Sequence, residues 1–214
     1  METNVQSVYN QWAETYDDLE NKTRDLDKIA TARILSKLIT SSMNVLEFGC
    51  GTGKNTEWLA TKTKHLTAVD FSEKMLAKAK DKLGDYNVEF LQADIMQQWP
   101  FAHNRYDVVV CNLILEHVEY LESVFVQASR VLKPSGHFFI SELHPSKQYI
   151  GSKANFELNQ QTISPNCYTH HVSDYFSAAI ANDFTCVDLS EWFDDDNNRN
   201  IVPRLISFLF RKKD

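Results

Sequence analysis

Residues 44–53 read Asn44-Val45-Leu46-Glu47-Phe48-Gly49-Cys50-Gly51-Thr52-Gly53, a hydrophobic run that ends in three glycines at alternate positions. The run predicts a buried strand that enters a tight turn, because glycine tolerates positive φ and leaves room for a ligand beside the backbone. A helix is predicted to follow over Lys54–Lys62. A strand-to-helix turn at the carboxyl end of a parallel strand binds nucleotide-like ligands in open α/β sheets.

Three acidic residues fall at the ends of predicted strands: Glu47, Asp70 and Asp94. Asp70 follows Gly49 by about 20 residues, which is the spacing of a carboxylate that binds a ribose. The glycine spacing G-x-G-x-G differs from the dinucleotide fingerprint G-x-G-x-x-G. We expect the three acids to line one pocket. The alternative for a single strand-end aspartate is a helix cap or a turn former, and Ser72 is a second candidate cap for the helix that begins at Glu73.

Predicted strands and helices alternate along the middle of the chain. The segments, in order, are 45–48, 54–62, 66–69, 73–83, 88–91, 106–111, 121–132 and 138–141. This alternation predicts right-handed strand–helix–strand crossovers and a parallel sheet between layers of helices. Two amphipathic helices are expected before it, over Val5–Leu19 and Leu26–Ile39. Lys133–Gly136 is expected to stop a helix and form a turn.

Five motifs stand in an order and spacing typical of one known family. They are E-F-G-C-G-T-G (47–53), V-D-F-S-E-K-M-L (69–76), Q-A-D-I (92–95), Y-D-V-V-V-C-N-L-I-L-E-H-V (106–118) and V-L-K-P-S-G-H-F-F-I-S-E (131–142). Over residues 44–142 the chain resembles the class I S-adenosylmethionine-dependent methyltransferases, of the type that acts on small molecules. The resemblance implies a Rossmann-like α/β fold: a mostly parallel seven-stranded sheet, helices on both faces, an antiparallel edge hairpin over 184–192 and 205–210, and an N-terminal helical lid.

The same resemblance implies S-adenosyl-L-methionine as the cofactor. The residues that it assigns to cofactor binding are Tyr16, Glu47, Gly49, Gly51, Asp70, Phe71, Met75, Asp94, Ile95, Asn112 and Leu113. Gly49, Gly51 and Glu47 would approach the methionine part, and Asn112 with Leu113 would border the sulfonium. Asp70 would bind the ribose, whereas Met75 and Asp94 would contact the adenine. Spacing alone allows a simpler interpretation of Met75 as a core residue.

The methyl acceptor is expected beyond the carboxyl ends of the fourth and fifth strands. His117 and His144 follow these strands, and a histidine is suited to act as a base near neutral pH. By resemblance, an N-terminal tyrosine closes over the reacting end, for which Tyr16 and Tyr9 are candidates. The catalytic candidates are therefore His117, His144 and Tyr16. Candidate substrate contacts are Tyr9, Tyr149, His170, His171, Tyr175 and Arg204. Alignment without a base, with the histidines as structural residues, stays an alternative.

Composition excludes several classes of protein. The net charge is −7, and an acidic balance disfavours a nucleic-acid partner, because such binding relies on neutralising phosphates. Four widely separated cysteines without a C-x-x-C pair predict no metal site and a reduced, cytoplasmic protein. No signal peptide and no apolar run long enough to span a membrane is recognised. A monomer or a homodimer is expected.

The predicted organisation is one methyltransferase domain over residues 1–214. It comprises a helical lid (1–42), a cofactor-binding core (43–142), a substrate cap with a helix (143–182) and two edge strands (183–214). The predicted function is methyl transfer to an oxygen, nitrogen or sulfur atom of a small molecule. Two alternatives stay open: a cofactor-binding protein without turnover, and a methylase of protein or RNA.

Overall fold

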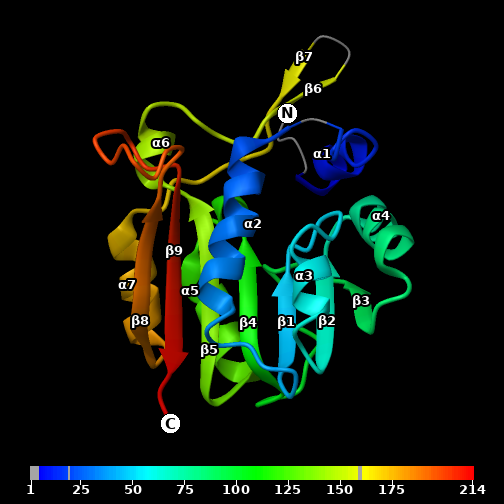
Figure 1. Ribbon diagram of the computed structural model, residues 1–214, viewed down its shortest axis with the longest axis vertical. Coiled ribbons are helices and arrows are strands. Elements are labelled where there is room, and N and C mark those ends of the chain that lie inside the picture. Colours follow the sequence, from blue (N-terminus) through cyan, green and yellow to red (C-terminus); the bar gives the residue numbers. More distant parts are fainter. Residues whose placement is uncertain (1–4, 19, 159–160) are drawn as a thin grey trace.

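A seven-stranded sheet forms the centre of the computed structural model, which describes residues 5–18, 20–158 and 161–214 (Figure 1). The strand order is β3-β2-β1-β4-β5-β9-β8. The strands are β1 (Asn44–Phe48), β2 (His65–Asp70), β3 (Val88–Gln92), β4 (Tyr106–Asn112), β5 (Leu132–Leu143), β8 (Phe184–Trp192) and β9 (Leu205–Lys212). Strands β1 to β5 are parallel, whereas β9 runs antiparallel to both β5 and β8. The predicted fold class is therefore confirmed.

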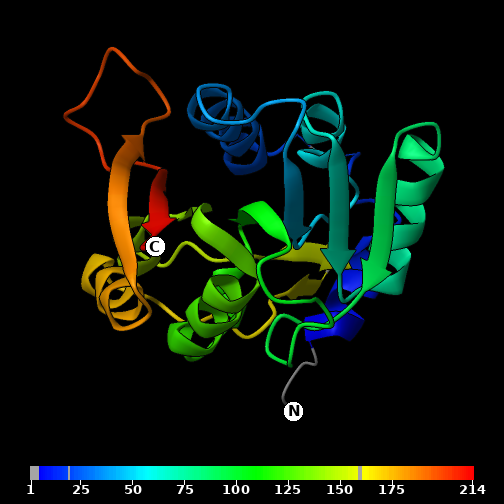
Figure 2. The same ribbon diagram turned by 90° about the horizontal axis from the view of Figure 1, so that it is seen from below.

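Helices cover both faces of this sheet. They are α1 (Val5–Trp12), α2 (Lys22–Leu35), α3 (Thr56–Ala60), α4 (Glu73–Leu83), α5 (Leu121–Val131), α6 (Pro145–Tyr149) and α7 (Val172–Ala181), with a 3₁₀ turn η1 (Leu115–His117). Figure 2 shows α2 on one side of the sheet and α5 with α7 on the other. Neighbouring residues of β5 confirm this layering, because Phe139 packs with α2 and Phe138 packs with α5 and α7.

The second helix begins four residues earlier than predicted. Asn21 caps α2 by accepting hydrogen bonds from the backbone N–H groups of Thr23 and Arg24, both at 3.0 Å. Such a cap satisfies N–H groups that have no partner inside the helix. The prediction of Leu26 as the first residue missed this cap. The helix also ends earlier than predicted, at Leu35 rather than at Ile39.

The first helix is shorter than predicted. Helix α1 ends at Trp12, and residues 13–18 form turns; Leu19, where the helix was expected to end, lies outside the described residues. The Thr52 hydroxyl donates a hydrogen bond to Asp17 at 2.9 Å, and this contact holds the segment after α1 against the glycine turn. The N-terminal segment thus reaches the carboxyl ends of the strands.

Two further boundaries differ from the sequence-based expectation. The helix after the glycine turn, α3, covers five residues instead of the predicted Lys54–Lys62, because the turn itself continues to Asn55. Lys133–Gly136 stops α5 as predicted, but it belongs to the start of β5 instead of a separate turn. The register of β5 against β4 breaks there, and Ser135 has a φ of 59°.

A small hairpin stands above the sheet between β5 and α7. It consists of β6 (Phe156–Leu158) and β7 (Gln161–Ile163), and Ile163 packs against the cluster formed by α1 and Met75 (Figure 1). Asn159 and Gln160, part of the predicted cap, are not among the described residues. Within the three described ranges, no helix combines the length and apolar character needed to cross a membrane.

Candidate active site

The glycine turn after β1 has the backbone geometry that its sequence predicts. Gly49, Gly51 and Gly53 have φ values of 76°, 54° and 86°, a region that other L-residues rarely adopt. Gly49 also lacks space for a side chain, since a Cβ there would lie 2.2 Å from Cγ2 of Ile114. Backbone conformation and close approach therefore both require glycine at position 49.

The acids at the carboxyl ends of β1 and β2 hold this turn together. Asp70 accepts hydrogen bonds from the backbone N–H groups of Gly51 and Ser72, both at 2.9 Å, and Glu47 accepts one from the Thr56 hydroxyl at 2.7 Å. Both carboxyl groups are buried. Burial raises the pKa of Asp70 to about 6 and that of Glu47 to about 8. Ser72 caps α4 by accepting from Met75 N–H at 3.1 Å, so the predicted cap is confirmed and Asp70 is not the cap of this helix.

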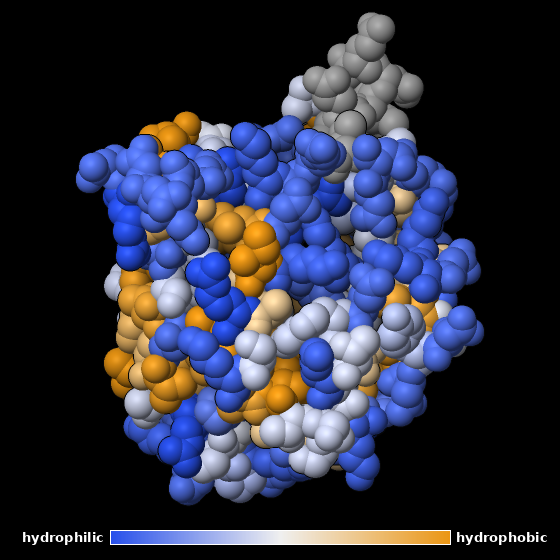
Figure 3. Space-filling view, viewed as in Figure 1, coloured by the Kyte–Doolittle hydropathy of each residue, from blue (hydrophilic) through white to orange (hydrophobic). Residues whose placement is uncertain are grey.

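One cavity at this end of the sheet brings together most of the residues that the sequence singled out. Its walls include Tyr9, Tyr16, Glu47, Gly49, Gly51, Asp70, Phe71, Met75, Asp94, Ile95, Asn112, Leu113 and His117. Figure 3 shows hydrophilic residues gathered around this end of the molecule, whereas apolar residues lie over β8 and β9. Among the described residues, no cluster of His, Cys, Asp and Glu side chains suits a metal ion.

Tyr9 and His117 form a hydrogen-bonded pair in the cavity wall. His117 Nδ1 lies 2.9 Å from the carbonyl oxygen of Asn166, and His117 Nε2 lies 2.9 Å from the Tyr9 hydroxyl. A carbonyl can only accept, so Nδ1 carries a proton, and in the neutral tautomer with this proton Nε2 presents its lone pair to Tyr9. Burial raises the pKa of Tyr9 well above its usual range. The hydroxyl therefore keeps its proton and can donate a hydrogen bond to His117 Nε2.

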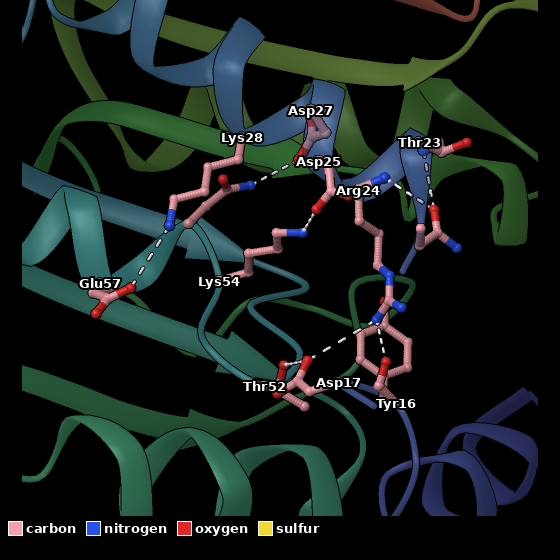
Figure 4. Close-up of polar contacts among 12 residues, drawn as sticks. Tyr16, Asp17, Thr23, Arg24, Asp25, Asp27, Lys28, Thr52, Lys54 and Glu57 are labelled. Atoms are coloured by element: carbon pink, nitrogen blue, oxygen red, sulfur yellow. Dashed lines mark hydrogen bonds and ion pairs between the residues drawn. The ribbon is translucent and has the colours of Figure 1, made fainter. Parts of the chain in front are cut away.

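The first turns of α2 contribute cavity residues that the sequence analysis missed (Figure 4). Arg24 and Asp27 both line the cavity. The Arg24 guanidinium lies 4.0 Å from the centre of the Tyr16 ring and donates to the Tyr16 carbonyl oxygen at 2.6 Å. Lys54, also in the wall, forms an ion pair with Asp25. The polar positions 24, 27 and 31 share one helical face, and the predicted start at Leu26 left position 24 outside the helix.

Asp27 fastens α2 to the strand ends. Its carboxylate accepts hydrogen bonds from Asn112 Nδ2 at 2.7 Å and from Asn55 Nδ2 at 2.8 Å. Asn112 Nδ2 also donates to the Thr31 hydroxyl at 2.7 Å. Burial raises the pKa of Asp27, and these hydrogen bonds oppose that rise. The side chain of Asn112 thus holds the helix, while the residue still borders the cavity.

Three of the candidate histidines do not line the cavity. His144 caps α6, where Nδ1 accepts from Ser146 N–H at 3.1 Å, and its Nε2 lies 3.2 Å from Glu191. His170 is buried, with Nε2 at 2.7 Å from the carbonyl oxygen of Val118. His171 precedes α7, and its Nδ1 lies 2.6 Å from the Tyr149 hydroxyl at the surface. Each ring thus has a partner outside the cavity, which favours a structural role.

The other substrate candidates also lie elsewhere. Tyr175 is buried and stacks on Phe208, with ring centres 4.7 Å apart. Arg204 binds the Asp194 carboxylate and donates to the Thr23 hydroxyl at 3.1 Å, so it joins the loop after β8 to the start of α2. Tyr149 is 59% exposed and points to His171. Of the six predicted substrate contacts, the structure brings only Tyr9 into the cavity.

Comparison with known proteins identifies the central part of the chain. A family model described as a methyltransferase domain matches residues 46–140, which contain the glycine turn, Asp70 and Asp94. Residues 46–140 belong to the methyltransferase domain family. The solved structure of an S-adenosylmethionine-dependent methyltransferase from Clostridium acetobutylicum superposes on this methyltransferase domain and its flanking segments with a TM-score of 0.71 and 19% identity. The superposition covers 97% of this chain and 100% of that one. The fold is thus that of the class I methyltransferases, whose cofactor is S-adenosyl-L-methionine.

Two curated relatives extend the similarity beyond the methyltransferase domain. A malonyl-[acyl-carrier protein] O-methyltransferase from Bacillus anthracis is 31% identical over 182 residues, which cover 78% of this chain and 65% of the relative. Phosphoethanolamine N-methyltransferase 1 from Triticum aestivum is 32% identical over 155 residues, which cover 66% of this chain and 31% of the relative. The chain thus spans less than two thirds of the length of either relative.

Proposed function

We propose that the protein transfers a methyl group from S-adenosyl-L-methionine to an oxygen, nitrogen or sulfur atom of a small molecule. The observation that carries this proposal is a single cavity that joins the glycine turn and the strand-end acids to the hydrogen-bonded Tyr9 and His117. A net charge of −7 supports a small-molecule acceptor over a nucleic acid. The names of the relatives include an O- and an N-methyltransferase, so they support methyl transfer without selecting the atom.

The nucleoside part of the cofactor fits the wall formed by β2, β3 and α4. Asp70 presents a buried carboxylate for the ribose hydroxyls, next to Phe71. Asp94, half-buried after β3, is an acceptor for the adenine amino group, and Ile95 and Met75 add apolar side chains to the lining of the same cavity. Polar groups at the rim with apolar contacts between them suit a flat heterocycle on a sugar.

The amino-acid part of the cofactor fits the opposite wall. Arg24 and Lys54 supply positive charges for its carboxylate, whereas Asp27 and Glu47 supply acceptors for its ammonium group. Gly51, whose missing side chain leaves open space, lets the backbone approach this part closely. A wall that carries both positive groups and acceptors suits a zwitterion, which needs partners of both kinds.

When bound, S-adenosylmethionine supplies an electrophilic methyl group on a positively charged sulfur. The protein aligns the acceptor with the S–CH₃ bond. This alignment lowers the activation barrier by several kcal/mol. The acceptor position proposed here lies between Ile114, Tyr9 and His117, on the side of Asn112 and Leu113. We assign residues 1–42 as the lid of this site and 143–182 as its cap.

Tyr9 and His117 can remove the acceptor's proton. Tyr9 would accept the acceptor's X–H proton on its oxygen and pass its own proton to His117 Nε2, which would become an imidazolium. The bound cofactor would supply the methyl group to X and keep the S–C electron pair on sulfur, so the positive charge would end on His117. The Asn166 carbonyl, which accepts from Nδ1, holds the ring in the required orientation during the transfer.

Incubation with methyl-labelled cofactor and a metabolite extract tests this function. We expect label in low-molecular-mass products after size separation, and none in a sample with the His117→Ala variant at the same exposure time. Label confined to macromolecules would replace a small-molecule acceptor by a protein or RNA. Cofactor binding by calorimetry without any label transfer would instead favour a binding protein on this scaffold.

A further inference from the structure

The turn from Leu113 to His117 contacts both the glycine turn and Tyr9 in the wall of the cavity. Ile114 packs against Gly49 of the glycine turn so closely that no Cβ would fit between them. His117, three residues later, contacts Tyr9. Leu113 has a φ of 55°, a left-handed conformation that costs an L-residue free energy. A segment under such strain keeps its shape only if its surroundings fix it.

Glu142, near the end of β5, supplies that fixation. One oxygen, Oε1, accepts hydrogen bonds from the backbone N–H groups of both Ile114, at 3.0 Å, and Leu115, at 2.8 Å. The carbonyl of the preceding residue, Ser141, accepts from Leu113 N–H at 2.8 Å. Glu142 is 1% exposed, so water cannot replace it as a partner of these N–H groups. Buried N–H groups without a partner are costly, and the turn therefore depends on this carboxyl group.

We propose that Glu142 is a positioning residue for methyl transfer, which fixes residues 113–117 so that Ile114 meets the glycine turn and His117 meets Tyr9. This inference rests on the proposed function, because it gives His117 a place beside the acceptor. Glu142 itself does not line the cavity and touches neither cofactor nor acceptor. It acts through the backbone of the turn.

The surroundings of the Glu142 carboxyl group determine which substitution mimics it. Its second oxygen, Oε2, is buried and has no hydrogen-bond partner within the described ranges. Burial raises the pKa of Glu142 well above its usual range, and the nearby Glu116 raises it further. A carboxyl group that uses one oxygen as acceptor is closely matched in shape by the amide of glutamine. Methionine has a similar length but offers the two N–H groups no effective acceptor.

The test compares Glu142→Gln with Glu142→Met, and uses hydrogen exchange besides activity. In Glu142→Met, we expect amide exchange at Ile114 and Leu115 to accelerate at least tenfold, while amides in the middle of β4 keep their protection. The kcat per cofactor-binding site should fall roughly 10- to 100-fold, the cost of a misplaced catalytic group, and the KM for the acceptor should change less. Glu142→Gln should restore both exchange protection and kcat to within about threefold of the unmodified protein.

Tyr106→Phe provides the matched control. It removes a buried hydrogen bond to Thr67 at the other end of β4, so it lowers stability without reaching the turn. The proposal would be overturned if Glu142→Met had the same amide exchange and kcat as the unmodified protein. It would also be overturned if Glu142→Gln were as impaired as Glu142→Met. A fall in kcat of similar size in Tyr106→Phe would also overturn it, since loss of stability would then explain the effect. If the unmodified protein shows no methyl transfer, the exchange experiment still decides whether Glu142 holds the turn.

Discussion

The two parts of the cavity are built in different ways. The cofactor part consists of strand ends and a glycine turn, in which backbone groups and neighbouring side chains hold one another, as Asp70 does for Gly51. The acceptor part is assembled from segments far apart in the sequence: Tyr9 from α1, His117 from η1 and the Asn166 carbonyl from the cap. The first part depends on local geometry and the second on tertiary contacts. Substitutions should therefore affect cofactor affinity in one part and turnover in the other.

The largest expected effect concerns the acceptor part. Replacing His117 by alanine removes the proton acceptor, and we expect kcat to fall about 10²–10⁴-fold while affinity for S-adenosylhomocysteine stays nearly unchanged. Tyr9→Phe should reduce kcat by a similar factor, and the double variant should be little worse than either single one, because the two side chains act as a unit. His144→Asn, outside the cavity, is the control and should retain turnover. Additive losses would contradict a shared proton path.

A second variant attacks the cofactor part. Gly49→Ala combines left-handed strain of about 1–2 kcal/mol with a clash against Ile114 that costs about 1–3 kcal/mol. We expect this sum to appear as lost stability and weaker cofactor binding, measured by chemical unfolding and calorimetry. Gly151→Ala separates the two contributions, since Gly151 has a φ of 94° but open space around its missing side chain. Unchanged cofactor affinity in Gly49→Ala would mean that the turn does not form the binding wall.

The carboxylate at the end of β2 should matter less than the glycine. Asp70→Ala removes a hydrogen-bond acceptor for Gly51 and for the ribose, and we expect a loss of about 1.5–3 kcal/mol in the binding of S-adenosylhomocysteine. Asp85→Ala, an exposed acid after α4, should leave the affinity unchanged. Equal affinities of the two variants, measured by calorimetry, would reject Asp70 as a ribose contact.

The smallest effect should be a dependence of both binding and stability on pH. Burial raises the pKa of Asp70 to about 6 and of Glu47 to about 8, so the folded, ligand-free protein retains protons that the unfolded chain releases. Its free energy of unfolding should therefore fall as pH rises from about 4.5 to 8. The affinity for the positively charged cofactor should instead rise severalfold between pH 6 and 8, as the carboxylates ionise. In Glu47→Gln, the upper part of both slopes should disappear.

Local spacing explains why the sequence could predict that the glycine turn and the strand-end acids lie together. The glycines and the acids at positions 47, 70 and 94 occupy ends of strands whose pattern fixes their place in the sheet. Arg24 was missed because α2 begins earlier than predicted, and one side-chain cap at Asn21 decides that start. Asp27 and Thr31 lie inside the predicted helix, but their partner Asn112 is far away in the sequence, so no local spacing pairs them.

The acceptor part was only partly predictable, for a physical reason. His117 and His144 each follow one of two adjacent strands, β4 and β5. His117 lies in the 3₁₀ turn η1 beside the cavity, whereas His144 is the N-cap residue of α6. That difference arises from tertiary hydrogen bonds such as those of Glu142, which no short motif encodes. Likewise, Tyr9 rather than Tyr16 reaches His117, because the chain turns after Trp12 and places Tyr16 under Arg24.

The position of α1 also sets an order of events. Val8 and Trp12 pack on Met75, which is 1% exposed, and the same helix carries Tyr9 to His117. If a nucleoside rests against Met75 as proposed, it has to arrive before α1 packs there, and the wall proposed for the acceptor forms only afterwards. We therefore expect a compulsory order in this protein, in which the cofactor enters first and its demethylated form departs last.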